Sequence, residues 1–329
     1  MPSLTLTDLK LYGSASMPDD NTPTAIGGAI ATSKKIDWQG DVAGLIQIVS
    51  SSAGDTTQTV QAFYRDPSGT LLNETRTLNG TTPVGYSANV DRLMKALKSA
   101  TTGGAVAIES QTAVRTGTCQ AGSTVNTLVL DAGASAVNGF YIGTVVRLTG
   151  GTGSGQINEI VGYDGTTKTA TMQDYWHGSI PDATTTFRIS NGFFFDRLPN
   201  EITEVRRPFY NAAANPPGGG AITFFDKCFF VNSSNSGALL TAQVVEFANP
   251  SGKIDFGLEA IVNGTNSNGA GNNRTVAPSG VSFATSTQTV PGTNLNAGSS
   301  IGVWLRLSLL DGDTAARSSV TMQLTGSAS

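Results

Sequence analysis

Three glycines in the stretch LTGGTGSGQINEI, at Gly151, Gly153 and Gly155, have a spacing that in other proteins can cradle phosphate groups. A phosphate-binding loop follows a strand, opens a helix and closes with Gly-Lys-Ser/Thr, because backbone N–H groups, a lysine and a helix N-terminus must converge on the phosphates. Here Gln156 stands where the helix should begin, and Ile157 continues in a β-type run. The glycines therefore predict a turn between two strands, and we expect no nucleotide or other cofactor to bind there.

A single histidine and two cysteines limit the catalytic and metal-binding chemistry open to the chain. His177 lies in the stretch DYWHGSIPD, but no G-x-S-x-G motif or other activated nucleophile accompanies it. A zinc site needs three or four Cys and His ligands, and the spacing of these residues does not supply them. Cys119 lies in a turn-like stretch and Cys228 in a buried-strand pattern, so we expect two free thiols rather than a disulfide. We predict neither a catalytic triad nor a metal site.

Paired carboxylates are the remaining route to an enzyme, because a glycosidase needs only two of them. The candidates in the middle of the chain are Glu159, Asp164, Asp174 and Asp182. Glu159 falls at an outward position of a hairpin strand, and Asp164 precedes a glycine in a turn pattern. A small β module also offers little depth for a substrate groove. The sequence therefore predicts a protein without enzymatic activity.

Two neighbouring aromatic residues are candidates to hold a sugar ring without cleaving it. Tyr175 and Trp176 directly precede His177, and both side chains combine a large apolar face with a polar group. We therefore name them as candidate ligand-facing residues. The alternative is that Trp176 belongs to the core of a small β module.

Composition predicts an all-β protein with a weakly charged surface. Charged residues make up 13% of the chain, against about 25% in an average soluble protein. Gly, Thr, Ser and Asn are abundant, and these residues favour turns and strands over helices. The net charge of −4 and the lack of a Lys/Arg cluster argue against a nucleic-acid partner. No basic leader and no run of about 18 apolar residues occurs, so we expect a chain made in a cytoplasm without a membrane anchor.

Short matches that recur in the same order predict a duplicated domain. The matched positions include Tyr12 with Tyr210, Pro67 with Pro250, and Asn79 with Asn263. We therefore predict two related β-sandwich domains, at residues 1–104 and 192–329, which flank a small antiparallel β-meander or barrel-like module at 105–191. The two sandwiches are expected to superpose with the same strand order.

Hydrophobic patterns place strands and one helix within these domains. Apolar β-type runs flank the glycine stretch, and Asp164-Gly165 predicts the hairpin that follows. The run at 302–309 predicts a core strand centred on Trp304. One short helix is predicted by apolar residues with the i, i+3, i+4, i+7 spacing, namely Val90, Leu93, Met94 and Leu97.

Adjacent phenylalanines predict an interface. A strand sends alternate side chains to opposite faces, so one ring of each adjacent pair in 193–195 and 224–225 should face outward from its sheet. Covering several such rings stabilises association, and we name Phe194 and Phe225 as candidate interface residues. The alternative is that another part of the same chain covers them.

Two parts of the chain resemble proteins of tailed bacteriophages. In the first, a strand, the stretch GGTGSGQ, a second strand ending in VGY, a GTT hairpin and then PDATTT resemble a small β module of tail, fibre and other virion proteins. The second part contains NPSGKIDFGLEAIVNGT, AGNNRTVAPSGVSF and GVWLRLSLLDGD, and it resembles a β-sandwich family of phage virion structural proteins.

The resemblance implies a noncatalytic structural protein of the virion that needs no cofactor. Its partners would be other copies of itself and neighbouring virion proteins, assembled through the β domains in the tail, baseplate, neck or capsid surface. An alternative from the same resemblance is a tail-fibre adhesin that binds a host receptor or surface carbohydrate. The station in the particle stays open, because related modules occur at all of these places.

Overall fold

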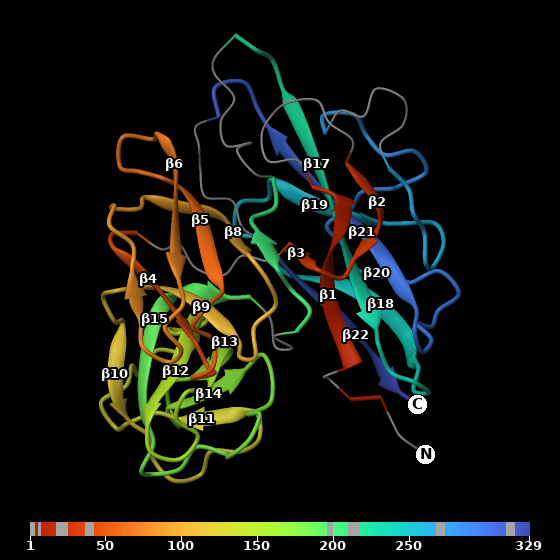
Figure 1. Cartoon of the computed structure of the whole chain (residues 1–329). Helices are drawn as coiled ribbons and strands as arrows, with labels where there is room; N and C mark the ends of the chain where they lie inside the picture. The colour runs from red at the N-terminus through yellow and green to blue at the C-terminus, as the bar shows by residue number, and fades with distance from the viewer. Residues whose placement is uncertain are drawn as a thin grey trace. The chain divides into compact units, whose positions relative to one another are not determined.

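In the computed structural model, the described residues form antiparallel β-strands that are joined by turns and loops (Figure 1). The described residues are 4–5, 8–17, 26–36, 43–195, 200–209, 218–267, 274–313 and 320–329. No α-helix and no closed barrel occurs in these ranges. The chain divides into two compact units, with residues 1–36 and 207–329 in unit 1 and residues 37–206 in unit 2. The all-β prediction is confirmed at this level.

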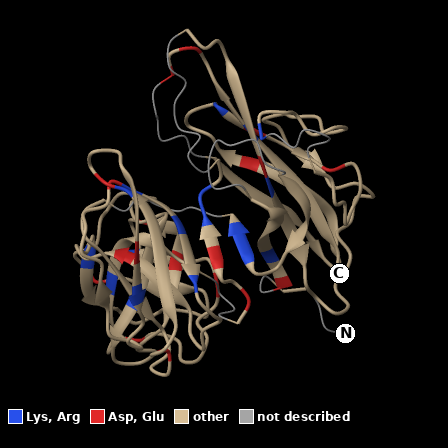
Figure 2. Cartoon of the chain, turned by 45° about the horizontal axis from the view of Figure 1, so that its top comes forward, with Lys and Arg blue, Asp and Glu red and all other residues tan. Residues whose placement is uncertain are grey.

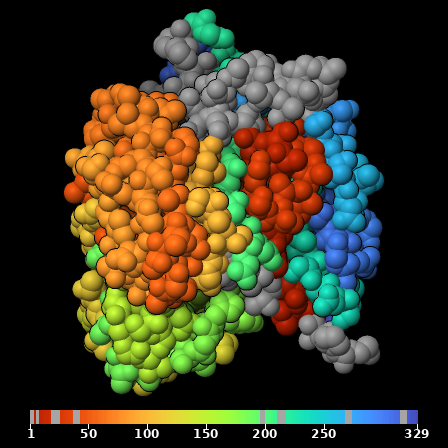
Figure 3. All heavy atoms as spheres, viewed as in Figure 1, coloured from red at the N-terminus to blue at the C-terminus, as the bar shows by residue number. Residues whose placement is uncertain are grey.

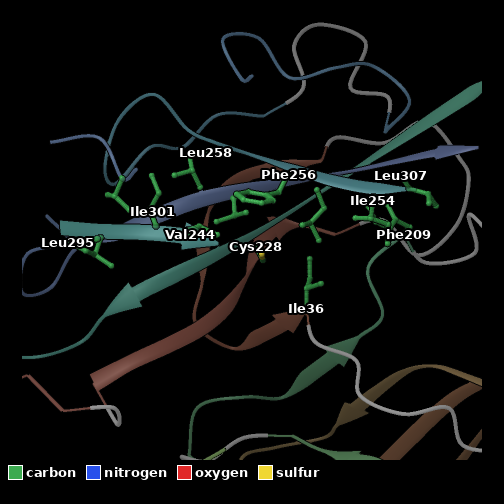
Figure 4. Close-up of a cluster of buried hydrophobic side chains, with 14 of the residues drawn as sticks. Ile36, Phe209, Cys228, Val244, Ile254, Phe256, Leu258, Leu295, Ile301 and Leu307 are labelled. Atoms are coloured by element: carbon green, nitrogen blue, oxygen red, sulfur yellow. The ribbon is translucent and has the colours of Figure 1, made fainter. Parts of the chain in front are cut away.

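Unit 1 is a sandwich-like pair of sheets around one apolar core. Its strands are β1 (Leu9–Ser16), β2 (Gly27–Ala31), β3 (Lys34–Ile36), β17 (Ile222–Asn232), β18 (Leu239–Ala248), β19 (Ile254–Leu258), β20 (Gln288–Thr289), β21 (Ser300–Leu309) and β22 (Thr321–Ala328). One sheet has the order β19-β21-β17-β1-β2, and the other has the order β20-β18-β22. Figure 4 shows buried side chains of both sheets, among them Val244, Phe256 and Ile301, in the core that joins them.

A buried ion pair lies beside that core in unit 1. Lys227 Nζ is 2.5 Å from Glu259 Oε1, and neither side chain has any exposed surface (0%). Nζ also donates to the backbone oxygens of Gly28 at 2.8 Å and Asn266 at 3.0 Å, so every hydrogen of the ammonium group has an acceptor. Burial lowers the pKa of Lys227, and the hydrogen bond to Glu259 opposes that shift. The ring of Trp304, which is buried at the centre of β21 as predicted, lies 5.5 Å from Nζ.

Unit 2 contains the remaining strands. They are β4 (Ile46–Ser50), β5 (Thr59–Arg65), β6 (Leu71–Thr77), β7 (Val84–Gly85), β8 (Arg92–Lys98), β9 (Val106–Ser110), β10 (Arg115–Thr118), β11 (Thr127–Val129), β12 (Thr144–Gly150), β13 (Ile157–Asp164), β14 (Thr169–Met172), β15 (Thr186–Phe194) and β16 (Glu204–Arg206). A long sheet has the order β11-β14-β13-β12-β15-β9-β4-β7, with β10 also paired to β15, and β16, β8, β5 and β6 lie side by side in a second sheet. Figure 3 shows the orange and green parts of unit 2 packed against each other.

A buried charge network ties the strands of the long sheet together. Glu109 of β9 is fully buried and accepts hydrogen bonds from Gln47 Nε2 at 2.7 Å and Ser190 Oγ at 2.6 Å. Arg147 Nη2 lies 3.1 Å, and Arg188 Nε 3.5 Å, from the same carboxylate. These partners come from β4, β12 and β15. One buried carboxylate therefore connects residues on both sides of the predicted boundary at 104–105.

The predicted short helix is wrong, because residues 92–98 form β8. This strand pairs with β5 on one side and β16 on the other. The adjacent Leu93 and Met94 are both buried, and the Lys95 ammonium lies 4.7 Å from the centre of the Phe63 ring. A strand that is covered on both faces shows no alternation of apolar and polar residues, so its pattern can match a helix by chance. Here the pairing of residues 92–98 with a strand on each edge determines that they form a strand rather than a helix.

The predicted match in strand order between the two sandwiches is also wrong. The two Pro-Ser-Gly turns are alike locally, since Gly69 and Gly252 both have positive φ angles, of 84° and 61°. The first turn joins β5 and β6, which pair as a hairpin, whereas the second joins β18 and β19, which lie in different sheets. Tyr210, the predicted match of Tyr12, lies outside the described residues.

The compact units also combine the chain differently from the three predicted domains. Strands β1 and β2 join β17 in unit 1 instead of forming a sandwich with residues 43–104. Residues 105–191 have an apolar core of their own. However, β15 pairs antiparallel with β9, and β9 pairs antiparallel with β4. The meander is therefore part of the long sheet of unit 2.

Both cysteines are free and buried, Cys119 in unit 2 and Cys228 in unit 1. Burial raises the pKa of the Cys119 thiol to about 12, which keeps it protonated and unreactive at neutral pH. We expect iodoacetamide to label neither thiol in the folded protein and to label both after denaturation, as measured by intact mass. A protein that carries no labelled thiol after denaturation without reductant contradicts this expectation, because its cysteines would be oxidised.

Candidate functional site

A pocket of about 400 Å³ opens on unit 2, where five segments of the chain meet. Its walls come from the end of β4, the loop before β9, the hairpin between β12 and β13, the turn after β14 and the end of β15. This volume lies within the range of about 300–1,000 Å³ that is typical of small-molecule sites. The pocket is therefore large enough for a small ligand.

The apolar part of the lining comes from Phe194 and Ile157. Both side chains are almost fully buried, and they pack with Val49, Ala107 and Val145 in a small cluster on the long sheet. The strands of this sheet fix the positions of both residues.

Asn158, Asp174 and His177 form a hydrogen-bonded wall of the pocket. Asn158 Nδ2 donates to the backbone oxygen of Asp174 at 2.8 Å, which fixes the start of the turn. Asp174 Oδ1 accepts the Tyr175 N–H at 2.8 Å, and Oδ2 lies 2.8 Å from His177 Nε2. The Asp174 side chain is only 4% exposed, whereas that of His177 is 56% exposed. The pair therefore presents an imidazole edge at the rim and a carboxylate beneath it.

Gln156 offers an acceptor at the pocket. Its Nε2 donates to the backbone oxygen of Ser179 at 2.9 Å, which orients the amide. Its Oε1 is buried and accepts no hydrogen bond from the described residues. A buried acceptor without a donor is unfavourable, and a ligand hydroxyl would supply one.

The glycine stretch is the connection of a β-hairpin, as predicted. Strands β12 and β13 pair antiparallel on either side of it. Gly151, Gly153 and Gly155 have φ angles of 72°, 79° and 91°, which other residues rarely adopt. Thr152 Oγ1 donates to Asp182 Oδ2 at 2.8 Å, and hydrogen bonds from Thr184 lower the pKa of that carboxyl. These contacts hold the hairpin loop beside the pocket.

Replacing Gly151 with alanine should destabilise unit 2 by roughly 2 kcal/mol or more. A Cβ atom at this position would lie 2.1 Å from the backbone oxygen of Thr184, in addition to the strain of the positive φ. Gly69→Ala is the matched control, because Gly69 has a similar φ and no atom of the described residues lies within 4 Å of the added Cβ. Thermal unfolding of both variants measures the difference, and equal losses of stability would show that the close approach to Thr184 does not matter.

The structure brings the two predicted ligand-facing aromatics to the pocket, with different roles. Trp176 is 6% exposed, belongs to the apolar core of the meander and donates from Nε1 to the backbone oxygen of Thr127 at 3.1 Å. Most of the Trp176 side chain therefore packs in the core of the meander, which was the alternative considered for this residue. Tyr175 is only partly buried, and its ring is the more available of the two.

The carboxylates considered for glycosidase chemistry do not converge on the pocket as a group. Only Asp174 lines it. Glu159 is 1% exposed, so its predicted outward orientation is wrong, because β13 has buried residues on both of its faces. Among the residues that the structure describes, no group of three or more His, Cys, Asp or Glu side chains is arranged to hold a metal ion.

Phe194 and Phe225, the predicted interface residues, are buried within their own units. Phe194 is 2% exposed in the cluster beneath the pocket, and Phe225 is 3% exposed beside Trp304 and Ile26. The interface prediction required an exposed ring at each of these positions, and neither ring is exposed. The strands that carry these rings, β15 and β17, have runs of adjacent buried residues, so neighbouring rings on both faces can be buried.

No family model matches the chain, and no curated protein matches it at a significant level. No helix in the described ranges has the length and apolar character needed to span a membrane.

Proposed function

We propose that this chain is a noncatalytic structural protein of a tailed-bacteriophage virion, which assembles with copies of itself or with neighbouring virion proteins. The sequence resemblance described above supports this function. The all-β architecture and the sparse charge, visible in Figure 2 as few coloured segments on each unit, agree with a protein that buries its faces against partners.

An exposed apolar stretch in unit 2 carries this proposal. Val137, Phe140 and Ile142 are 62%, 55% and 50% exposed, and Val161 on the adjoining strand β13 is 40% exposed. The Gly139 N–H donates to the Tyr163 backbone oxygen at 2.9 Å, which connects the stretch to β13. Large apolar side chains that are held in the solvent mark interaction surfaces more often than chance.

Light scattering of purified variants tests this surface. Phe140→Ser should lower the assembled mass while leaving the thermal unfolding temperature nearly unchanged, because an exposed ring adds little to folding. Phe247→Ser is the matched control, since Phe247 is an exposed phenylalanine (66%) of unit 1 and should leave the mass unchanged. An oligomer that survives Phe140→Ser would remove this stretch from the proposal.

A receptor- or carbohydrate-binding adhesin is the second candidate function. The pocket of unit 2 favours it, because the predicted aromatic pair lies there beside polar groups. The two functions are compatible in one virion protein, and they are separated by which substitutions impair binding and which impair assembly.

A further inference from the structure

We infer that the pocket of unit 2 binds one ring of a neutral, hydroxyl-rich ligand, such as a monosaccharide unit of a glycan. The inference names the ligand class for the pocket of the second candidate function and rests on that candidate, but it does not rest on the proposed assembly function. It combines the charge of the lining, its hydrogen-bonding groups and its apolar surface.

The charge of the lining selects against ionic ligands. Among the described residues that line the pocket there is no Lys or Arg, the side chains that most often pair with a phosphate or carboxylate group. The carboxylate of Asp174, which is the one carboxylate among the described lining residues, is already hydrogen-bonded to His177 Nε2 and to the Tyr175 N–H. A cationic ligand would have to compete with both of these contacts. A neutral ligand meets neither penalty.

The hydrogen-bonding groups fit hydroxyls. Gln156 Oε1 is a buried acceptor without a donor among the described residues, and a ligand O–H would satisfy it. The hydroxyl groups of Ser51 and Ser154 can each donate or accept. A hydroxyl group can also do both, so a ring that carries several of them can match such a mixed wall.

The apolar side chains fit the C–H face of a sugar ring. Phe194 and Ile157 form a buried apolar surface, and the partly exposed ring of Tyr175 lies in the same pocket. A sugar ring has an apolar C–H face and a polar edge, and aromatic side chains bury such a face while a polar group stays at the edge. A wholly apolar ligand would instead leave Gln156 Oε1 without a donor.

Saturation-transfer NMR and calorimetry with glucose, galactose and N-acetylglucosamine test this site on the full chain. We expect at least one of the sugars to bind saturably with a dissociation constant on the order of 1 mM. Tyr175→Ala and Gln156→Met should each weaken that binding about tenfold, a loss typical of one stacking or hydrogen-bonding contact. Phe247→Ala, which changes an exposed ring of unit 1, should leave it unchanged.

Two further probes distinguish other ligand classes. Tetramethylammonium and inorganic phosphate should give no saturable signal that Tyr175→Ala removes. Binding of either ion at this pocket without binding of a sugar would overturn the inference, as would a lack of saturation with all three sugars. Sugar binding that both pocket variants leave intact would also overturn it, provided that their circular dichroism spectra match the parent. The assembled mass of the same samples reports on the assembly proposal separately.

Discussion

Replacing Lys227 with methionine should lower the free energy of unfolding of unit 1 by about 3–5 kcal/mol. Methionine has a similar volume but leaves the Glu259 carboxylate buried without its cation, and Glu259 Oε2 already has no hydrogen-bond partner among the described residues. The backbone oxygens of Gly28 and Asn266 would lose their shared donor as well. Hydrogen exchange of peptides from β17 and β21, followed across a urea series, measures the loss within unit 1.

Two controls separate charge burial from general damage. The double variant Lys227→Met/Glu259→Leu should recover most of the stability, because apolar replacement of a whole buried ion pair is often close to neutral. Lys253→Met removes a partly exposed pair with Asp313, whose atoms lie 2.9 Å apart, and should change stability by about 1 kcal/mol or less. If Lys227→Met has as small an effect as Lys253→Met, the ion pair does not stabilise unit 1 as described.

Replacing Glu109 with leucine should destabilise unit 2 by about 2–4 kcal/mol. The change removes the acceptor of Gln47 and Ser190, and it leaves Arg147 and Arg188 close together without their shared carboxylate. Because the partners lie on β4, β12 and β15, we expect the loss of hydrogen-exchange protection to spread across the predicted boundary at 104–105.

The matched control for Glu109 is Asp131→Asn. Asp131 pairs with Arg115 in the same unit, but both side chains are about a quarter exposed, so the loss should be about 1 kcal/mol or less. Loss of protection confined to residues 105–191 after the Glu109 substitution would contradict the continuous sheet and would restore a separate module.

Local features of the fold could be predicted from the sequence. The glycine hairpin and the hairpin at Asp164-Gly165 were predicted from residues that lie within each turn, and such turns depend mainly on local backbone preferences. In the hairpin at Asp164-Gly165, the turn was predicted but its detailed conformation was not, because the positive φ falls on Lys168 rather than on Gly165. Strand β8 was predicted wrongly as a helix, since the burial of both of its faces depends on strands that are distant in the sequence.

The assignment of segments to units could not be predicted in the same way. Strand β1 pairs with β17 across about two hundred residues of chain, as in the pairing of Tyr12 with Phe229. Pairing over such a separation leaves no local pattern in the sequence. The short sequence matches between residues 1–104 and 192–329 reflected similar turns that lie in different sheets. The buried Lys227 and Glu109 were missed for a related reason, because burial of a charge depends on partners supplied by other strands.

The candidate pocket was predicted in part. Tyr175 and Trp176 were named from their types and neighbours, and both line the pocket. Gln156 and Ser51 were not predicted as ligand-facing residues, because their approach depends on how the hairpin and the end of β4 fold together. The weak signal that was available is Gln156 itself, a polar residue placed directly after a glycine turn.

The copy number of this protein in purified phage particles is the most direct test of the proposed role as a structural part of a virion. Particles would be purified from a host that carries the gene, and their proteins quantified by mass spectrometry against labelled peptides of this chain. We expect a fixed number of copies per particle that matches a symmetric ring or lattice of subunits. Its absence from purified particles, with the protein recovered only in the soluble lysate, would contradict the claim.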